Sequence, residues 1–246
     1  MQKNKILIGV VVYNEASKLT ALLSRIEKIL HKENYYFLFI NDNSTDMSQI
    51  LLKKFVEKHK NCDLVNHNKN SGVGKSIKDI ISYALNKNYS ICVIMAGNGK
   101  DNPLEIKKLL KPIVSSGYDY VQGSRFLEGG SFDNLPFARK MMIKGFTFLF
   151  FLFTGFAQTD TSNGFRAYKL SIFKNKNINL QQSWLDRYEL ETYIHYKVIT
   201  LGYKICEVPV SKNYLQGIKN YSKIRPIIDW WKMMSPLFYL RFGIKN

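Results

Sequence analysis

Cysteine and long apolar runs are scarce in this chain, and each shortage excludes a class of protein. Its three cysteines, Cys62, Cys92 and Cys206, are odd in number and lack the short paired spacings of a zinc site or a disulfide framework. We therefore expect reduced thiols. The most apolar stretch, residues 145–157, falls short of the ~20 residues that span a bilayer. It can lie on a membrane but not cross one.

Acidic residues are also scarce, because 19 Asp and Glu stand against 36 Lys and Arg, a formal net charge of +17. Such a surface attracts polyanions, so nucleic acid, phospholipid headgroups and a phosphorylated substrate are all compatible partners. The basic residues are dispersed without a recognisable nucleic-acid-binding module, so we expect no specific nucleic-acid partner. The first residues, 1–5, lead directly into an apolar run that predicts a strand, without the longer apolar stretch and cleavage site of a secretory signal. We therefore expect a cytoplasmic protein.

Three short apolar runs in the first half of the chain each end abruptly in a polar loop. They cover residues 6–12, 36–40 and 91–95. Parallel strands that are buried on both faces read as unbroken apolar runs. Ligands of open α/β sheets bind beyond the carboxyl ends of such strands. We therefore expect the chemistry in the three loops that follow.

Helical periodicity of apolar residues alternates with these strands. The first three helices are expected over residues 17–30, 47–59 and 77–85. Further helices are expected at 104–114 and 186–201, with short strands at 63–66, 118–122 and 204–210. The alternation predicts an α/β fold, a mostly parallel sheet with helices on both faces.

Residues 69–76 contain Gly72, Gly74 and Lys75 and look at first like a phosphate-binding P-loop. That motif requires a glycine five positions before Gly74, where Lys69 stands, so the spacing excludes it. Two interpretations remain. The segment alone favours a tight turn that begins a helix, and the alternative is a backbone that approaches a diphosphate with Lys75 beside it.

A polar cluster, Asp42 with residues 43–46, follows the second buried strand. The Asp42 carboxylate can accept hydrogen bonds from a ring N–H of a base or from a ribose hydroxyl. Ser44 or Asp46 can instead cap the next helix. The two interpretations are compatible, with Asp42 functional and Asp46 structural.

Six short motifs occur in a fixed order along residues 5–225. They are Val12-Tyr13-Asn14-Glu15, Asn41-Asp42-Asn43-Ser44-Thr45-Asp46, Asn68 with Gly72, Gly123-Ser124-Arg125, Asp160 with Gly164-Phe165-Arg166, and Glu207-Val208-Pro209-Val210. Together they resemble the family 2 glycosyltransferases. Within that family the chain is most similar to the polyprenyl-phosphate sugar transferases, of the dolichyl-phosphate mannose synthase type.

The resemblance implies a GT-A fold, which is Rossmann-like, and an inverting transfer from a nucleotide-diphosphate sugar. It also implies a nucleotide site at Tyr13, Asn14, Glu15, Asn41, Asp42, Gly72 and Lys75. Tyr13 and Glu15 would line the nucleobase pocket, and Asp42 would contact the base or the ribose. Asn41 stands where an acid is common, which leaves uracil, guanine and cytosine open as the base.

The third loop departs from the family pattern. Relatives carry Asp-x-Asp there to hold Mg²⁺ or Mn²⁺ on the diphosphate, and this chain has Ala96-Gly97-Asn98. Ala96 offers no ligand, and a single amide oxygen from Asn98 binds a hard cation weakly. Three alternatives stay open. Asp101 completes a metal site with Asn98, Lys100 replaces the metal by pairing with the diphosphate, or the chain is a non-catalytic relative that only binds a nucleotide sugar or an anionic lipid.

Catalysis requires fixed positive charge, because the leaving nucleoside diphosphate gains negative charge in the transition state. Lys75, Lys100 and Arg166 are the candidates. A hydroxyl acceptor would also need a general base, whereas a lipid phosphate is already ionised. By the resemblance, Glu189 and Glu191 lie where relatives place acids that face the acceptor. Either could act as the base for a hydroxyl acceptor, and Glu191 is the catalytic candidate. The alternative for both glutamates is a solvated helix face.

By the resemblance, Arg125 and Arg139 would bind the acceptor phosphate, and Ser222 with Lys223 matches a Ser-Lys pair in a loop of that group. The Phe-rich segment within residues 139–158 predicts an interfacial helix, or alternatively a core helix that covers the sheet. The basic, aromatic tail at 212–246 favours contact with anionic headgroups.

We therefore expect a GT-A catalytic domain over residues 1–211, which includes the aromatic helix, and a C-terminal extension over 212–246. The expected function is transfer of a sugar from a UDP- or GDP-sugar to a polyprenyl phosphate, at the cytoplasmic face of a membrane. The alternative acceptor is a saccharide hydroxyl in the synthesis of a surface polysaccharide.

Overall fold

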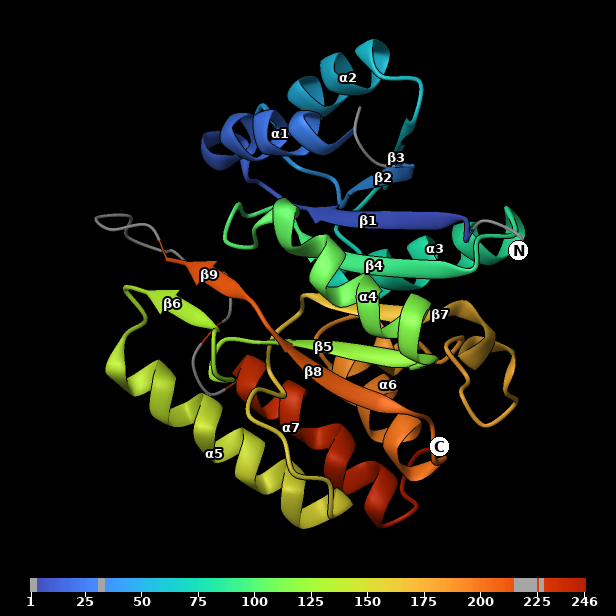
Figure 1. Ribbon diagram of the computed structural model, residues 1–246, viewed down its shortest axis with the longest axis vertical. Coiled ribbons are helices and arrows are strands. Elements are labelled where there is room, and N and C mark those ends of the chain that lie inside the picture. Colours follow the sequence, from blue (N-terminus) through green and yellow to red (C-terminus); the bar gives the residue numbers. More distant parts are fainter. Residues whose placement is uncertain (1–3, 31–33, 215–224, 226–227) are drawn as a thin grey trace.

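The computed structural model describes residues 4–30, 34–214, 225 and 228–246. In these ranges the central sheet has seven strands in the order β3-β2-β1-β4-β7-β5-β8 (Figure 1). From one edge to the other they are β3 (Cys62–Asn66), β2 (Tyr35–Asn41), β1 (Ile6–Val12), β4 (Ile91–Ala96), β7 (Arg166–Lys169), β5 (Tyr120–Ser124) and β8 (Ile205–Pro209). Only β7 runs antiparallel to its neighbours in this sheet. The predicted mostly parallel sheet is confirmed.

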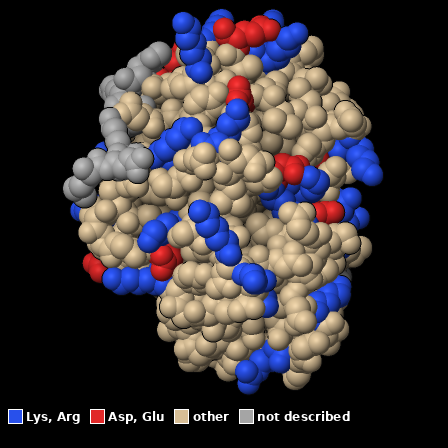
Figure 2. Space-filling model, turned by 90° about the vertical axis from the view of Figure 1, so that its right-hand side faces the viewer, with Lys and Arg blue, Asp and Glu red and all other residues tan. Residues whose placement is uncertain are grey.

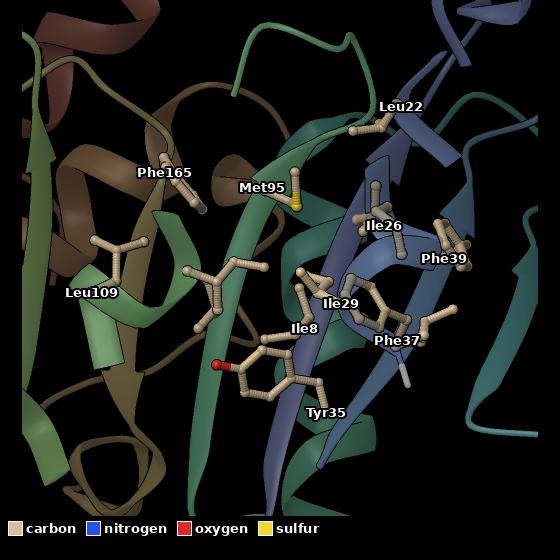
Figure 3. Packing of buried hydrophobic residues seen from close by; sticks show 14 of the residues in the cluster. Ile8, Leu22, Ile26, Ile29, Tyr35, Phe37, Phe39, Met95, Leu109 and Phe165 are labelled. Carbon is tan, nitrogen blue, oxygen red and sulfur yellow. The ribbon is translucent and has the colours of Figure 1, made fainter. Parts of the chain in front are cut away.

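One face of the sheet is covered by three helices, α1 (Ala16–Leu30), α2 (Ser48–Lys58) and α4 (Ile106–Ser116). Apolar side chains of α1 recur every three to four residues, so they form one stripe along the helix. Figure 3 shows Ile26 and Ile29 of this stripe beside Ile8 and Phe37 of the strands, and all four are buried. Because this packing requires an apolar stripe on the helix and apolar residues along the strands, the sequence pattern correctly predicted α1, β1 and β2.

The opposite face is covered by α3 (Val73–Asn86) and α6 (Glu189–Thr200), with the short helix η2 (Leu170–Lys174). Two other short helices, η1 (Pro103–Glu105) and η3 (Ser183–Leu185), precede α4 and α6. η1 covers the predicted start of α4 at residue 104, so α4 itself begins two residues later, and α6 begins three residues after its predicted start at 186. With helices on both faces of the sheet, the α/β architecture is confirmed.

The predicted strand at 118–122 is displaced by two residues in the structure. Gly117 ends α4 with a positive φ of 67°, and the Tyr118 N–H donates to the Pro112 carbonyl at 3.2 Å. Tyr118 therefore completes the helix end, and β5 begins only at Tyr120. β7, where the sequence analysis predicted no strand, is a strand of four residues.

Two further helices, α5 (Phe137–Thr154) and α7 (Ile228–Arg241), lie side by side below the sheet in Figure 1. They share an apolar cluster with α6 that includes Ile143, Phe150, Trp230 and Leu237. Nearby, β6 (Ser131–Asp133) pairs in parallel with β9 (Ser211–Asn213). In the described ranges, no helix combines the length and apolarity that crossing a bilayer requires.

Candidate active site

A cavity of about 590 Å³ lies beyond the carboxyl ends of β1, β2, β3 and β4. We call its two sides the sheet wall and the helix wall. The sheet wall comes from the loops after these strands and includes Tyr13, Glu15, Asp42, Gly72, Ala96, Asn98 and Lys100. The helix wall comes from α5, α7 and the residues that precede α6 and α7, and includes Arg139, Ile143, Arg187, Tyr188, Arg225, Asp229, Trp230, Lys232 and Met233.

The first two loops are joined by hydrogen bonds. Asn14 adopts a positive φ of 48°, its N–H donates to Ser44 Oγ at 2.9 Å, and its Oδ1 accepts from the Thr45 N–H at 2.7 Å. The Glu15 N–H donates to Ser48 Oγ at 2.9 Å. Asn14 lies outside the described cavity lining, so its part in the site is to hold the two loops together.

The Asp42 carboxylate lines the cavity and organises the turn beside it. It accepts from the Ser71 N–H at 2.7 Å and from the Gly72 N–H at 2.8 Å. His67 Nδ1 lies 2.8 Å from the same carboxylate, and His67 Nε2 lies 3.0 Å from Asp79. Burial opposes ionisation of Asp42, but the His67, Ser71 and Gly72 hydrogen bonds outweigh it and lower the Asp42 pKa.

His67 was missed by the sequence analysis, although it lies one residue after β3 at the same edge of the sheet. Its hydrogen bonds to Asp42 and then Asp79 raise its pKa to about 9 against the effect of burial. The imidazole is therefore protonated near neutral pH. Its charge stabilises the Asp42 carboxylate, which holds the residue 71–72 turn.

Asn41, Lys75 and Gly72 have different surroundings. Asn41 donates to Asn66 Oδ1 at 2.9 Å and lies outside the described lining of the cavity. Lys75 forms an ion pair with Asp79 and also lies outside that lining. Gly72 lines the cavity with a φ of 101°, and a side chain there would meet the Asp186 carbonyl. The geometry supports the tight-turn interpretation of this segment.

In the third loop, Asn98 and Lys100 line the cavity but Asp101 lies outside the described lining. Asp101 is only 1% exposed. Its Oδ1 lies 2.9 Å from Lys212 Nζ, and its Oδ2 accepts from the Ala96 N–H at 3.3 Å. Its carboxylate is therefore engaged with the protein behind the loop.

Lys100 is 7% exposed, and its Nζ lies 5.1 Å from the centroid of the Tyr214 ring. Burial, and after it the charges of Lys212, Arg139 and Lys18 in decreasing order, lower the Lys100 pKa to about 7. Several positive charges thus meet at one buried place. An anion bound there would favour the charged form of Lys100.

The residues of this site do not fit a divalent cation of the kind held by Asp-x-Asp. Ala96 presents only a methyl group, and Asn98 Oδ1 already accepts from the Lys100 N–H at 3.1 Å. Throughout the described ranges, no group of three or more His, Cys, Asp or Glu could hold a metal ion. The predicted pairing of Asn98 with Asp101 as metal ligands lacks geometric support, because the Asp101 carboxylate is paired with Lys212.

Arg125 and Arg166 are both buried, and their guanidinium groups are engaged with the protein. Arg125 lines the cavity, but its Nε and Nη2 lie 2.6 and 2.7 Å from the two Asp160 oxygens. Arg166 donates to the carbonyls of Asn163, Glu191 and Thr161 at 2.7, 2.9 and 3.0 Å. Arg166 lies outside the described lining, so it positions its neighbours instead of facing the cavity.

Glu191 and Glu189 differ in their access to the cavity. Glu191 lines it, and its Oε1 lies 3.7 Å from Arg166 Nε. Glu189 lies outside the described lining, and burial raises its pKa. Only Glu191 is therefore placed to contact a bound molecule directly.

The helix wall contains cations that the sequence analysis did not single out, Arg187, Arg225 and Lys232. They join the predicted Arg139, and Asp229 pairs with Arg225 at 3.1 Å. Ser222 and Lys223 lie outside the described residues. The sequence signal for Arg225 and Lys232 is their place in the basic, aromatic tail at 212–246.

Charge is concentrated in the cavity. Among its described lining residues are eight Lys and Arg against four Asp and Glu. On the surface shown in Figure 2, by contrast, Lys and Arg are scattered among neutral residues. The cavity is therefore suited to a ligand with several negative charges.

The Glycosyl transferase family 2 family matches residues 7–176 of this chain. The chain belongs to this family. It is 30% identical over 183 residues to UDP-N-acetylglucosamine--dolichyl-phosphate N-acetylglucosaminyltransferase of Methanococcus voltae, covering 73% of this chain and 69% of the relative. It is 23% identical to polyprenol monophosphomannose synthase of Mycolicibacterium smegmatis, covering 83% and 76%.

A solved structure, glucosyl-3-phosphoglycerate synthase from Mycobacterium tuberculosis in complex with UDP, superposes with a TM-score of 0.71. It is 13% identical and covers 99% of this chain and 82% of that one. Another structure of that enzyme contains Mn²⁺ and UDP. The GT-A fold, the glycosyltransferase family and the prediction of a hexosyltransferase are therefore confirmed.

Proposed function

We propose that this glycosyltransferase moves a sugar from a UDP- or GDP-sugar to a polyprenyl phosphate, with inversion at the anomeric carbon. One observation carries the proposal. A single cavity, rich in positive charge, is bounded on one side by the loops of the sheet and on the other by α5 and α7. Such a cavity can hold two phosphorylated molecules with a sugar between them. The names of the relatives support this pair of substrates.

The sheet wall is the proposed donor site. Tyr13 and Asp42 are available to the nucleoside, and Asn98 and Lys100 to the diphosphate. During transfer the bond between the anomeric carbon and the donor phosphate oxygen breaks, and its electrons stay on the leaving diphosphate. Fixed cations at the leaving group stabilise that charge without reorganisation.

The helix wall is the proposed acceptor site. Arg139, Arg187, Arg225 and Lys232 can align an ionised phosphate, whose oxygen attacks the anomeric carbon from the face opposite the leaving group. No proton must be removed from such an acceptor, so no general base is needed. The phosphate oxygen forms the new bond, and the nucleoside diphosphate leaves.

The outer faces of the same helices suit the lipid tail of this acceptor. Phe137, Phe148 and Leu152 of α5 are 77%, 61% and 60% exposed, and Trp231 of α7 is 52% exposed. Apolar side chains beside a basic surface favour a peripheral position at the headgroup level of an anionic membrane. We therefore propose peripheral association with the cytoplasmic face of a membrane.

Transfer of a radiolabelled sugar into a product that partitions into organic solvent tests the proposal. We expect lipid-phosphate-dependent incorporation that is lost in Arg139→Ala and retained in Arg241→Ala, which removes an exposed arginine outside the described cavity lining. Glu191→Gln should retain transfer, because an ionised phosphate needs no base. Label in an oligosaccharide, with none in lipid, would contradict a lipid acceptor.

A second acceptor, a saccharide hydroxyl, is favoured by one observation. Glu191 lines the cavity beside Gly164, where any side chain would meet the Glu191 Oε1. A carboxylate in that place can accept the proton of an attacking hydroxyl. For this acceptor, Glu191→Gln would abolish transfer, so the same variant separates the two chemistries.

A further inference from the structure

The carboxylates around the cavity are already paired with cations of the protein. Mn²⁺ or Mg²⁺ requires several oxygen ligands, preferably charged ones. In the described lining each acid has a basic partner: Glu15 with Lys18 at 2.8 Å, Asp42 with His67 at 2.8 Å, Glu191 with Arg166 at 3.7 Å and Asp229 with Arg225 at 3.1 Å. A divalent cation would have to displace one of these partners.

The third loop shows the same feature at closer range. Asp101 is the acid closest in sequence to the missing Asp-x-Asp, and the Lys212 Nζ lies 2.9 Å from its Oδ1. Lys212 Nζ also donates to Asn163 Oδ1 at 2.8 Å. The Lys212 ammonium is thus paired with Asp101, the one acidic residue of this loop that could have bound a metal ion.

Lys100 is held where the loop faces the cavity. Its N–H donates to Asn98 Oδ1 at 3.1 Å, and its carbonyl accepts from the Asn213 N–H of β9 at 3.1 Å. Arg25 Nη2 donates to the Gly99 carbonyl at 2.7 Å. The backbone on both sides of Lys100 is therefore braced. An ammonium that is 7% exposed also interacts more strongly with an anion than one in water does.

We infer that Lys100 replaces the divalent cation at the donor diphosphate, so that nucleotide binding and sugar transfer proceed without a metal ion. This inference rests on the proposed function, because it takes the ligand of the sheet wall to be a nucleoside diphosphate. An ammonium can donate to diphosphate oxygens in the ground state and keep these bonds as negative charge accumulates on them.

Calorimetric titration of the unmodified protein with UDP, GDP and CDP, in EDTA and then in MnCl₂, tests the inference. We expect at least one nucleotide to bind with a Kd that differs by less than about twofold between the two buffers. Binding that is more than about tenfold tighter in MnCl₂ would overturn the inference and leave the proposed function intact. If none of the nucleotides binds in either buffer, both fail.

Lys100→Met tests the residue itself. We expect its affinity for the nucleoside diphosphate to fall by about tenfold or more, while its affinity for the matching nucleoside changes little. The matched control is Lys107→Met, which removes an exposed lysine of α4 outside the described lining. Equal diphosphate affinity in Lys100→Met and the control would contradict the role of Lys100.

Replacing Lys100 by the Asp-x-Asp metal motif sharpens the test. Ala96→Asp with Asn98→Asp, added to Lys100→Met, should restore diphosphate binding in MnCl₂ but not in EDTA. If diphosphate binding were also restored in EDTA, the idea that a metal ion and the Lys100 ammonium can substitute for each other would be contradicted. Thermal melting identifies variants that fail to fold. The comparison of EDTA with MnCl₂ uses the unmodified protein, so it tests metal independence even if a variant does not fold.

Discussion

The two walls of the cavity are built differently. On the sheet wall, Asp42 is buried and holds a backbone turn through two hydrogen bonds, and it accepts a third from a protonated His67. On the helix wall, Asp229 is equally buried, but its partner Arg225 is 62% exposed and comes from outside the helix. The sheet wall is preorganised by contacts within the fold. The helix wall presents long basic side chains that can adapt to a ligand.

This difference suits the two proposed ligands. A nucleotide has a fixed shape, and a rigid site avoids the entropy cost of ordering loops around it. A lipid phosphate arrives with a long chain that stays in the membrane, so its headgroup needs flexible cations near an apolar surface. Substitution of a buried carboxylate on the sheet wall should therefore affect folding as well as nucleotide binding, whereas substitutions on the helix wall should mainly affect substrate use.

The largest effect should separate Arg125 from Arg139, which the sequence predicted to share one role. Arg125→Ala leaves Asp160 buried without its bidentate partner, so we expect a loss of about 4 kcal/mol of unfolding free energy. Arg139→Ala removes a partly exposed side chain and should cost about 1 kcal/mol or less. Urea unfolding of both variants measures the difference. Equal losses would remove the distinction between a positioning arginine and a phosphate-binding one.

Asp42 and Asp229 form the next pair. Asp42→Asn should cost about 3 kcal/mol, because it leaves a protonated His67 facing a neutral amide in a buried site. Asp229→Asn should cost about 1 kcal/mol, since its partner is mostly in water. Nucleotide binding should weaken strongly in Asp42→Asn and little in Asp229→Asn. A similar stability of the two variants would contradict the rigid sheet wall.

The sequence predicted the sheet wall better than the helix wall, for a physical reason. Strands such as residues 6–12 are buried on both faces, and helices such as 17–30 carry one apolar stripe, so both leave local patterns. Loops at the ends of neighbouring parallel strands then meet by topology alone. Asp42 and Asn98 therefore reach one cavity, as the strand order required.

The helix wall depends on contacts between distant segments that leave no local pattern. Arg187, Arg225 and Arg139 come from three separate parts of the chain. The sequence also could not distinguish Arg166, which binds carbonyls, from an arginine that faces a ligand. Residue type is the same in both cases, and only burial and partners separate them.

A pH dependence of stability should report on the sheet wall. The pKa of His67 is raised to about 9 in the folded protein from 6.5. Its contribution is therefore fully present below pH 6.5 and is lost as the pH rises through about 9. We expect the unmodified protein to exceed His67→Gln in stability by about 3 kcal/mol more at about pH 6 than at about pH 10. A constant difference would show that His67 is neutral.

The smallest effect on folding should come from α5, where a buried and an exposed phenylalanine can be compared. Phe148→Ser should change the unfolding free energy by about 0.5 kcal/mol or less, because its side chain is 61% exposed. Phe150 is fully buried, so Phe150→Ser should cost about 3 kcal/mol. In flotation assays with anionic vesicles, Phe148→Ser should bind about tenfold more weakly, since the apolar side chain no longer enters the interface. Unchanged vesicle binding in Phe148→Ser would mean that the protein binds anionic lipid through charge alone. In that case, a higher salt concentration would release the protein from the vesicles.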